Sequence, residues 1–262
     1  MVVFDDGSDT ETLQANAWLK NDTEVRYRKM PENIGRSAIR NRLASLAQAS
    51  YLLFLDDDSK VYRPDFLSRY LACREPSTVV CGGREYSKEL PGEAFSLHWQ
   101  YGHKKESRPA RQKASHPYRA FHSNNFMIPR RVWQKLPFDE SLQQYGHEDT
   151  LLGYGLQKAG FPVQHIDNPI IHAQLETNAQ FLAKTRLAVQ NLKLLYDRGE
   201  QGFNASVNLL RVYQRAKTLG LAIALAGLFK TQEETWEKNL SEGHSPSLRT
   251  FNLYKLGYLC SL

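Results

Sequence analysis

Three consecutive carboxylates, Asp56, Asp57 and Asp58, directly follow the apolar run Tyr51 to Leu55. A short apolar run bounded by turn-forming residues predicts a buried strand. Carboxylates crowded at the end of such a strand repel one another and resist desolvation, so a cation is their natural partner. Their oxygen atoms suit Mg²⁺ or Mn²⁺, and an ion held there could stabilise the charge on a departing diphosphate. The structural alternative is an acidic turn in solvent.

A second acidic cluster, Asp5 and Asp6, ends another strand-like run, Val2 to Phe4. Between the two runs, residues 37–48 carry apolar side chains at helical spacing. Strand, helix and strand in this order predict a parallel βαβ unit. Because ligands of open α/β sheets bind beyond the carboxyl ends of the strands, both clusters should face one crevice.

A third acidic pair, Glu148 and Asp149, stands where a helix is predicted to begin. The helix should run from Thr150 to Ala159 and end at Gly160. Acidic residues in a first turn suit the helix dipole and can cap it, which is worth about 1 kcal/mol. Capping is therefore the purely structural interpretation of Asp149.

The rest of the chain predicts an α/β domain over residues 1–177 and a helical extension over 178–262. Further strands are expected at 79–81 and 126–128. The segment 88–118 is polar, basic and irregular, and predicts a mobile loop near the site.

Composition indicates an ordinary soluble globular protein, with 262 residues, 41% hydrophobic and 24% charged. The net charge of +6 is compatible with nucleic acid, an anionic membrane or a phosphorylated substrate, but a solvated surface is favoured because the charge is distributed. Three cysteines without metal-ligand spacing argue against a disulfide framework. We expect a cytoplasmic protein without a secretory leader or a membrane span.

The run from Leu219 to Phe229 is apolar and has basic neighbours on both sides. It is too short to cross a bilayer. A buried core helix is slightly preferred to an interfacial helix resting on anionic lipid at the inner face of the membrane.

Four short motifs occur in order along about the first 175 residues and together resemble the family 2 glycosyltransferases. They are Phe4-Asp5-Asp6-Gly7-Ser8, Asn33-Ile34-Gly35-Arg36-Ser37, Leu55-Asp56-Asp57-Asp58 and Glu148-Asp149. The stretch before the last motif, Phe138 to His147, resembles the family's acceptor-side motif. The resemblance implies a GT-A fold, which is a Rossmann-like mixed sheet flanked by helices, and sugar transfer from a nucleotide-diphosphate sugar to an acceptor hydroxyl.

The resemblance places the donor nucleotide at the first three motifs. The residues implied there are Asp5, Asp6, Asn33, Gly35, Arg36, Arg40, Asp56 and Asp57. Plain helix surface is the alternative for the two arginines.

The resemblance also implies a metal site for Mn²⁺ or Mg²⁺. Asp56 and Asp58 resemble the family's Asp-x-Asp element, and His172 resembles a histidine that completes the metal site in some members. A lone histidine is more often structural, and this alternative stays open.

By the same resemblance, Asp149 is the general base and Glu148 orients it or the acceptor. The base must reach the acceptor hydroxyl from the side opposite the leaving diphosphate, so a single displacement inverts the anomeric centre. His147, Asn124 and Asn125 are implied acceptor or sugar contacts.

Family members normally carry another strand and helix, roughly 30 residues, before the first acidic turn. We expect this unit to be absent here, which would remove one edge of the nucleotide pocket.

Two other classes remain as alternatives. One is a non-catalytic module that binds a nucleotide sugar or nucleic acid, which the positive charge favours and the full set of carboxylates opposes. The other is a magnesium-dependent phosphatase, which the Ser59-Lys60 continuation after Asp58 disfavours. The favoured partners are a nucleotide-diphosphate sugar, most commonly a UDP-sugar, and a glycan or lipid-linked acceptor, without nucleic acid.

Overall fold

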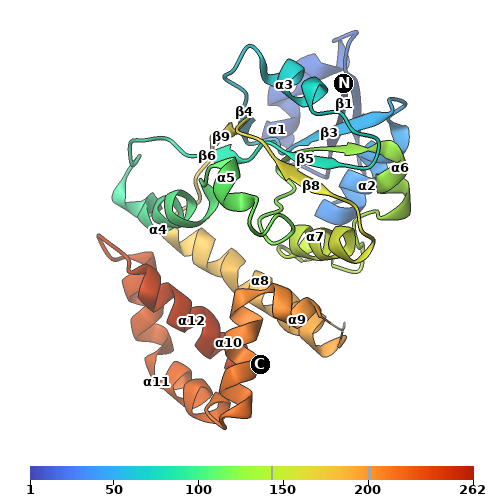
Figure 1. Cartoon of the computed structure of the whole chain (residues 1–262). Coiled ribbons are helices and arrows are strands. Elements are labelled where there is room, and N and C mark those ends of the chain that lie inside the picture. The colour runs from blue at the N-terminus through green and yellow to red at the C-terminus, as the bar shows by residue number, and fades with distance from the viewer. Residues whose placement is uncertain (143, 200–201) are drawn as a thin grey trace.

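The computed structural model describes residues 1–142, 144–199 and 202–262. Strands and short helices of the first part of the chain form a mixed α/β body, and the long helices of the C-terminal part lie below it (Figure 1). The expected α/β fold with a helical extension is therefore observed.

A central sheet of order β3-β7-β5-β8 is built from the apolar runs that the sequence marks as strands. Its strands are β3 (Tyr51–Leu55), β5 (Val79–Cys81), β7 (Asn125–Pro129) and β8 (Val163–His165). Strand β7 is antiparallel to both β3 and β5, whereas β5 and β8 are parallel. This mixed sheet places the end of β3, and with it Asp56 to Asp58, beside the start of β7.

Two smaller sheets flank the central one. Strand β1 (Val2–Asp5) pairs in parallel with β2 (Arg26–Lys29), and β9 (Ile170–His172) lies between β4 (Ser59–Lys60) and β6 (Arg84–Glu85). The predicted βαβ unit differs, because β1 takes the charged strand β2 as its parallel partner. Charged residues 26–29 carry no apolar alternation, so periodicity could not reveal this strand.

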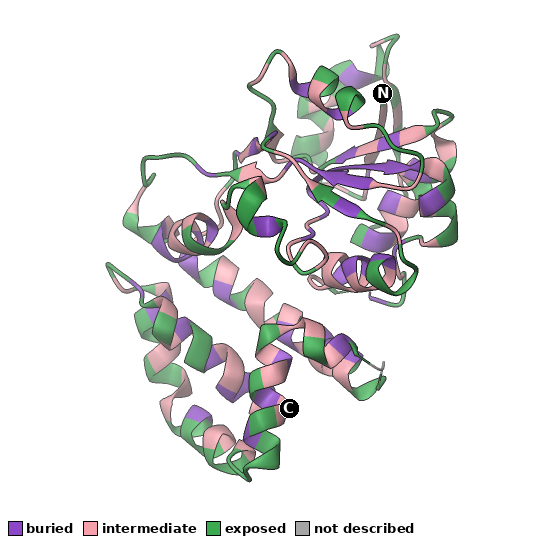
Figure 2. Ribbon diagram, in the orientation of Figure 1, coloured by how far each residue is buried: buried purple, intermediate pink, exposed green. Residues whose placement is uncertain are grey.

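Alternating side chains of the central strands pack on opposite faces of the sheet. Phe54, Phe126 and Ile128 belong to the cluster on one face, while Val80 and Met127 belong to the cluster on the other. The Phe54 and Phe126 rings stack with centroids 4.8 Å apart. Buried residues accordingly line the central strands in Figure 2.

Short helices cover this body. They are α1 (Thr10–Ala15), η1 (Ala17–Lys20), α2 (Arg36–Leu46), α3 (Phe66–Ala72), α6 (Arg130–Lys135) and α7 (Glu148–Lys158). Helices α2 and α7 begin near each other, so the first two turns of α2 carry Arg36 and Arg40 to Glu148 at the start of α7.

The segment 88–118 is not the irregular loop that its polarity predicts. It contains η2 (Glu93–Phe95), α4 (Ser96–Tyr101), a π-helical turn η3 (Gly102–Glu106) and α5 (Ala110–Lys113). Leu97 is fully buried, and its N–H donates to the Asn178 side chain 2.8 Å away. Contacts with a residue 81 positions later order this segment, and local composition carries no sign of them.

The C-terminal helices form a second cluster of apolar side chains. They are α8 (Asn178–Asp197), α9 (Phe203–Ser206), α10 (Asn208–Thr218), α11 (Ala222–Ser241) and α12 (Leu248–Ser261). Thr177 and Gln180 form a capping box that begins α8. The cluster also takes in Leu97 and Leu142, so the helical extension packs directly on the α/β body.

The preferred prediction for residues 219–229, a buried core helix, is wrong for most of the run. Phe229 is buried, but Leu219, Leu221, Ile223 and Leu228 are exposed. None of the residues that the structure describes covers this face of the corner between α10 and α11, and composition alone cannot show which face is left exposed. Among the described residues, no helix is both long and apolar enough to cross a membrane.

Candidate active site

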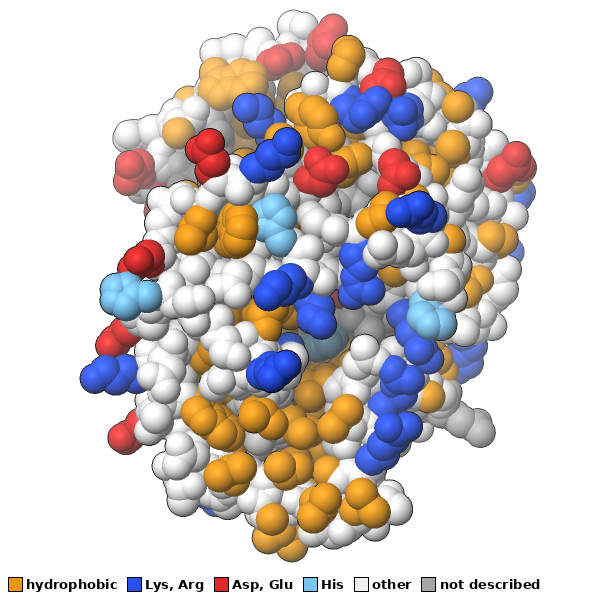
Figure 3. All heavy atoms as spheres, turned by 60° about the vertical axis from the view of Figure 1, so that its left-hand side comes forward, with side chains coloured by type: hydrophobic (Ala, Val, Ile, Leu, Met, Phe, Trp, Pro, Cys, Tyr) orange, Lys and Arg blue, Asp and Glu red, His pale blue; other side chains and the backbone are white. Residues whose placement is uncertain are grey.

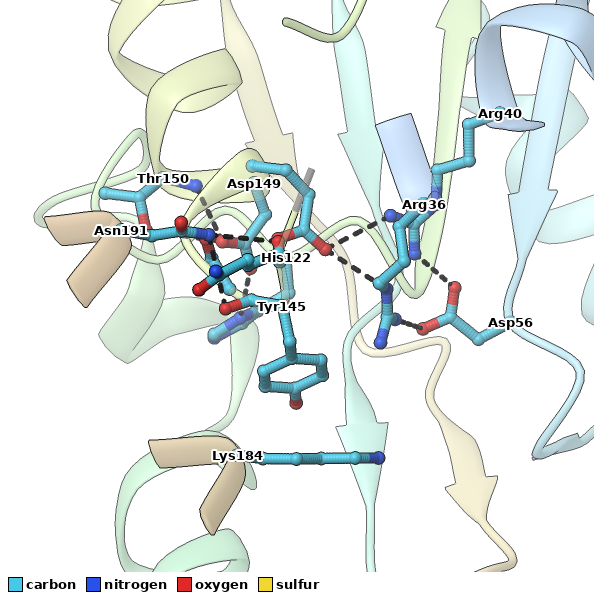
Figure 4. A network of polar contacts seen from close by, with 12 residues as sticks. Arg36, Arg40, Asp56, His122, Tyr145, Asp149, Thr150, Lys184 and Asn191 are labelled. Carbon is cyan, nitrogen blue, oxygen red and sulfur yellow. Dashed lines mark hydrogen bonds and ion pairs between the residues drawn. The ribbon is translucent and has the colours of Figure 1, made fainter. Parts of the chain in front are cut away.

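Two arginines from α2 join an aspartate after β3 to a glutamate at the start of α7. Arg40 lies 2.7 Å from Asp56 Oδ1 and 3.3 Å from Glu148 Oε1. Arg36 lies 3.2 Å from each of the same carboxylates (Figure 4). We call Arg36, Arg40, Asp56 and Glu148 the acid–arginine cluster. The sequence predicts these residues at one site, and the structure brings them together as ion pairs.

The two arginines differ in exposure. The Arg40 side chain is 8% exposed and the Arg36 side chain is 43% exposed. Burial alone lowers the pKa of Arg36, but the charges of Asp56 and Glu148 outweigh burial and raise it. The Arg36 guanidinium therefore stays charged, and of the two arginines it is the one with an open side from which an anion could approach.

Asp149 follows Glu148 in the chain, and two contacts hold its carboxylate in place. His122 Nδ1 lies 3.3 Å from Oδ2, and the Thr150 N–H donates to Oδ1 at 2.6 Å. Burial alone would raise the pKa of Asp149, but the hydrogen bond and charge of His122 outweigh burial and lower that pKa. The group is a carboxylate at neutral pH, as a proton acceptor must be.

Asp149 is not the N-cap of α7, which is His147, although it lies in the first turn and accepts the Thr150 N–H there. His147 has a left-handed backbone with φ 70°, directly after Gly146 with φ 103°. Such a conformation is uncommon outside glycine and marks a tightly determined turn. The turn aims the first residues of α7 at the acid–arginine cluster.

A residue from the helical extension holds this turn. The Asn191 amide donates to the carbonyl oxygens of Gln144, Tyr145 and Gly146 at 2.9, 3.3 and 3.0 Å (Figure 4). A Cβ at Gly146 would lie 2.6 Å from Ala188 Cβ, so α8 and the turn are in close contact. Sequence reasoning missed Asn191, and no local signal marks it.

The Tyr145 ring lies between the α/β body and the helical extension. Arg36 and Lys184 each lie 5.1 Å from the centre of its ring. The lysine comes from α8, so the ring links the acid–arginine cluster to the helical extension. Tyr145 belongs to the stretch that resembles the acceptor-side motif, whereas Lys184 lies outside every predicted motif.

Asp58 and His172 meet where β4 pairs with β9, with Oδ2 and Nδ1 3.3 Å apart. The other carboxylate oxygen, Asp58 Oδ1, is buried without a hydrogen-bond partner. Neighbouring ligands of an octahedral ion are about 3 Å apart, given metal–oxygen distances near 2.1 Å. These two residues therefore fit a divalent cation.

The third predicted ligand is engaged elsewhere. Asp56 accepts both arginines, and no group of three or more His, Cys, Asp or Glu side chains arranged to hold a metal occurs in the described part of the chain. Only Asp58 and His172 of the predicted metal residues come together. Asp57, the middle residue, is exposed.

The N-terminal motifs form one compact turn. Asp6 accepts the N–H groups of Ile34 and Gly35 at 2.9 and 3.2 Å, and Asn33 Oδ1 also accepts from Gly35. Asp5 accepts the Ser8 N–H at 2.8 Å. Four of the predicted donor residues, Asp5, Asp6, Asn33 and Gly35, thus lie together, and most of their side-chain acceptor oxygens are used to shape the turn.

The two predicted asparagines have different surroundings. Asn125 uses its amide on Tyr70, Gly83 and Asn168. Asn124 is 2% exposed, and neither atom of its amide has a hydrogen-bond partner. Of the two, Asn124 therefore keeps its hydrogen-bonding groups free for a ligand. His147, the third predicted acceptor or sugar contact, lies 3.1 Å from the Thr150 hydroxyl through Nδ1, and burial lowers its pKa.

Residues 1–136 match the family model described as glycosyl transferase family 2, and the chain belongs to that family. It is 33% identical over 98 residues to the Escherichia coli (strain K12) protein WcaA, which carries the name colanic acid biosynthesis glycosyl transferase. The match covers 34% of this chain and 35% of WcaA, so the chain spans about a third of the length of that relative.

The fold is shared over a longer stretch. The mannosyltransferase PcManGT from Pyrobaculum calidifontis, solved in complex with GDP-Man and Mn²⁺, superimposes with a TM-score of 0.56 at 15% identity. The superposition covers 99% of this chain and 75% of PcManGT. The GT-A fold expected from the sequence is thereby confirmed, and the likeness includes the helical extension.

Proposed function

We propose that the chain is an inverting, metal-dependent glycosyltransferase. It moves a sugar from a nucleotide-diphosphate sugar to a hydroxyl of a glycan or lipid-linked acceptor. The observation that carries this proposal is the acid–arginine cluster, which links the strand end bearing Asp58 to the helix start bearing Asp149. Sugar transfer needs groups that hold the donor diphosphate next to a group that accepts the proton of the acceptor hydroxyl, and these two positions provide them.

Asp58 and His172 would hold the metal, Mn²⁺ or Mg²⁺, which when bound neutralises charge on the leaving diphosphate. The open side of Arg36 supplies a second positive group on the same edge. Asp6 and Asn33 shape the turn that would receive the nucleotide. Asn124, with its unpartnered amide, supports a contact to the donor sugar.

Asp149 would accept the proton of the acceptor hydroxyl as that oxygen attacks the anomeric carbon. The carboxylate is kept in place by His122 and by the Thr150 N–H. Attack from the side opposite the leaving diphosphate gives inversion. Glu148 cannot share this role in the same way, because both arginines bind its carboxylate.

Donor binding is tested by calorimetric titration of a panel of nucleotide-diphosphate sugars with and without Mn²⁺. Asp58→Ala should lose the metal-dependent part of binding, while Glu234→Ala, an exposed change in α11, should bind like the wild type. Absence of binding by every donor would contradict the proposed donor class.

The base role is tested with Asp149→Asn, which keeps the shape of the side chain. The turnover rate should fall by about 10²- to 10⁴-fold while donor affinity is unchanged. Unchanged turnover would refute the base assignment. Donor binding without turnover in the wild type would instead support the non-catalytic alternative, and the anomeric configuration of the product decides inversion.

A further inference from the structure

The corner between α10 and α11 exposes large apolar side chains. Leu219, Leu221, Ile223 and Leu228 are 71, 50, 86 and 47% exposed, and we call them the apolar corner. They occupy the end of α10, the turn at Gly220 and the first two turns of α11. Scattered surface leucines need no explanation, but four within ten residues form a patch that does.

The exposure is a property of the corner and not of α11 as a whole. On the exposed face of this helix Ile223, Ala224 and Leu228 are followed by Lys230, Glu234 and Lys238. The opposite face packs inward through Phe229 and Leu240. The helix is therefore anchored in the tail, and its first half presents an apolar surface to the outside.

In the stretch of sequence that contains the apolar corner, every charge from residue 201 to residue 232 is positive. Residues 201–232 contain Arg211, Arg215, Lys217 and Lys230 and no aspartate or glutamate. The Lys217 ammonium lies 5.3 and 5.6 Å from the rings of Tyr196 and Tyr213, which fixes its position. Figure 3 shows hydrophobic side chains gathered low on this face, with lysine and arginine side chains along their border.

We propose that the apolar corner is a docking surface for an anionic lipid bilayer. Leucine and isoleucine side chains would enter the boundary of the acyl region, and Arg215, Lys217 and Lys230 would meet the headgroups. A second copy of the chain fits less well, because pairing this surface with itself brings like charges together. Helix α11 would lie in the interface rather than across the bilayer. This inference does not depend on the proposed sugar transfer.

The test is flotation of the full chain with vesicles of phosphatidylcholine alone and of phosphatidylcholine mixed with phosphatidylglycerol. The wild type should float with the anionic vesicles and lose binding as salt rises. Ile223→Asp should weaken binding by about tenfold or more. Lys230→Glu should weaken it by about fivefold or more on anionic vesicles only.

The matched control is Leu67→Asp in α3, where the leucine is 61% exposed at the other end of the molecule. It should bind like the wild type, and equal melting temperatures would show that all variants fold. Absence of wild-type binding to anionic vesicles at low salt overturns the proposal. Equal loss in Ile223→Asp and Leu67→Asp overturns it too, as does a dimer in solution that Ile223→Asp dissociates while lipid binding is absent.

Discussion

The acid–arginine cluster and the apolar corner differ in whether their charged side chains are paired. In the cluster, each of Arg36 and Arg40 faces both Asp56 and Glu148, so positive and negative groups balance within the fold. Around the corner, basic side chains stand beside exposed leucines without an acidic residue in the surrounding sequence. The ion pairs of the cluster hold its side chains in position. The basic side chains beside the apolar corner, which form no ion pair with any residue that the structure describes, fit instead the proposed contact with an anionic bilayer.

The largest effect that sharpens this comparison should come from Arg40→Met. Removal of the buried guanidinium leaves Asp56 and Glu148 close together with only the exposed Arg36 to oppose them. Breaking a buried ion pair from one side costs about 3–5 kcal/mol of unfolding free energy. Urea denaturation measures the loss, and Arg36→Met should lose much less. Equal losses in the two variants would contradict the idea that burial distinguishes them.

A smaller effect is expected at the joint between the two regions. Asn191→Ala leaves three carbonyl oxygens of residues 144–146 without their donor. The free energy of unfolding should fall by about 2 kcal/mol. Turnover should fall while donor affinity stays constant, because the turn aims Asp149 and not the nucleotide site. Asn239→Ala, at an exposed position of α11, is the control and should change neither quantity.

Replacement of Lys255 in α12 should increase stability, in contrast to the changes above. Burial lowers its pKa to about 8, with Lys105 adding to the effect. The folded state therefore binds its proton less tightly than the unfolded chain, whose pKa is about 10.4. Wild-type stability from this group should rise as pH increases from about 8 to 10.4.

Lys255→Met should stabilise the protein at pH 7 by about 1–2 kcal/mol, because relief of the buried charge is partly offset by loss of the contacts that the ammonium makes with the Tyr101 and Phe251 rings. The gain should shrink across the same pH window, and thermal denaturation at a series of pH values checks it. A gain that is independent of pH would show that burial of the charge is not its cause.

The smallest loss of stability is expected at a partly exposed ion pair between the helical extension and the α/β body. Arg198 pairs with Asp139 at 3.0 Å. Arg198→Ala should cost less than about 1 kcal/mol, because solvent screens such pairs. A loss as large as that of Arg40→Met would remove the distinction between buried and exposed pairs.

Local sequence patterns were sufficient to predict the strands that end in acidic residues. Tyr51–Leu55 and Val2–Asp5 form strands as expected, and their carboxylates lie at the candidate site. The family and the fold could also be predicted, because their motifs are short and contiguous.

Contacts between distant segments could not be predicted from the same patterns. Leu97 bonds to Asn178, and the turn at Tyr145 is held by Asn191. Because both partners lie far along the chain, neighbouring residues do not indicate either contact. The exposure of Ile223 likewise depends on which helices pack against α11. Periodicity shows that a helix has two faces, but packing decides which of them is covered.

The sharing of Arg36 between two carboxylates has a consequence for communication within the site. An anion that draws Arg36 away from Asp56 also draws it away from Glu148, next to Asp149. By thermodynamic reciprocity, a ligand at the start of α7 whose affinity is changed by that anion must change the affinity for the anion by the same factor. The two halves of the site are therefore linked through one side chain, Arg36.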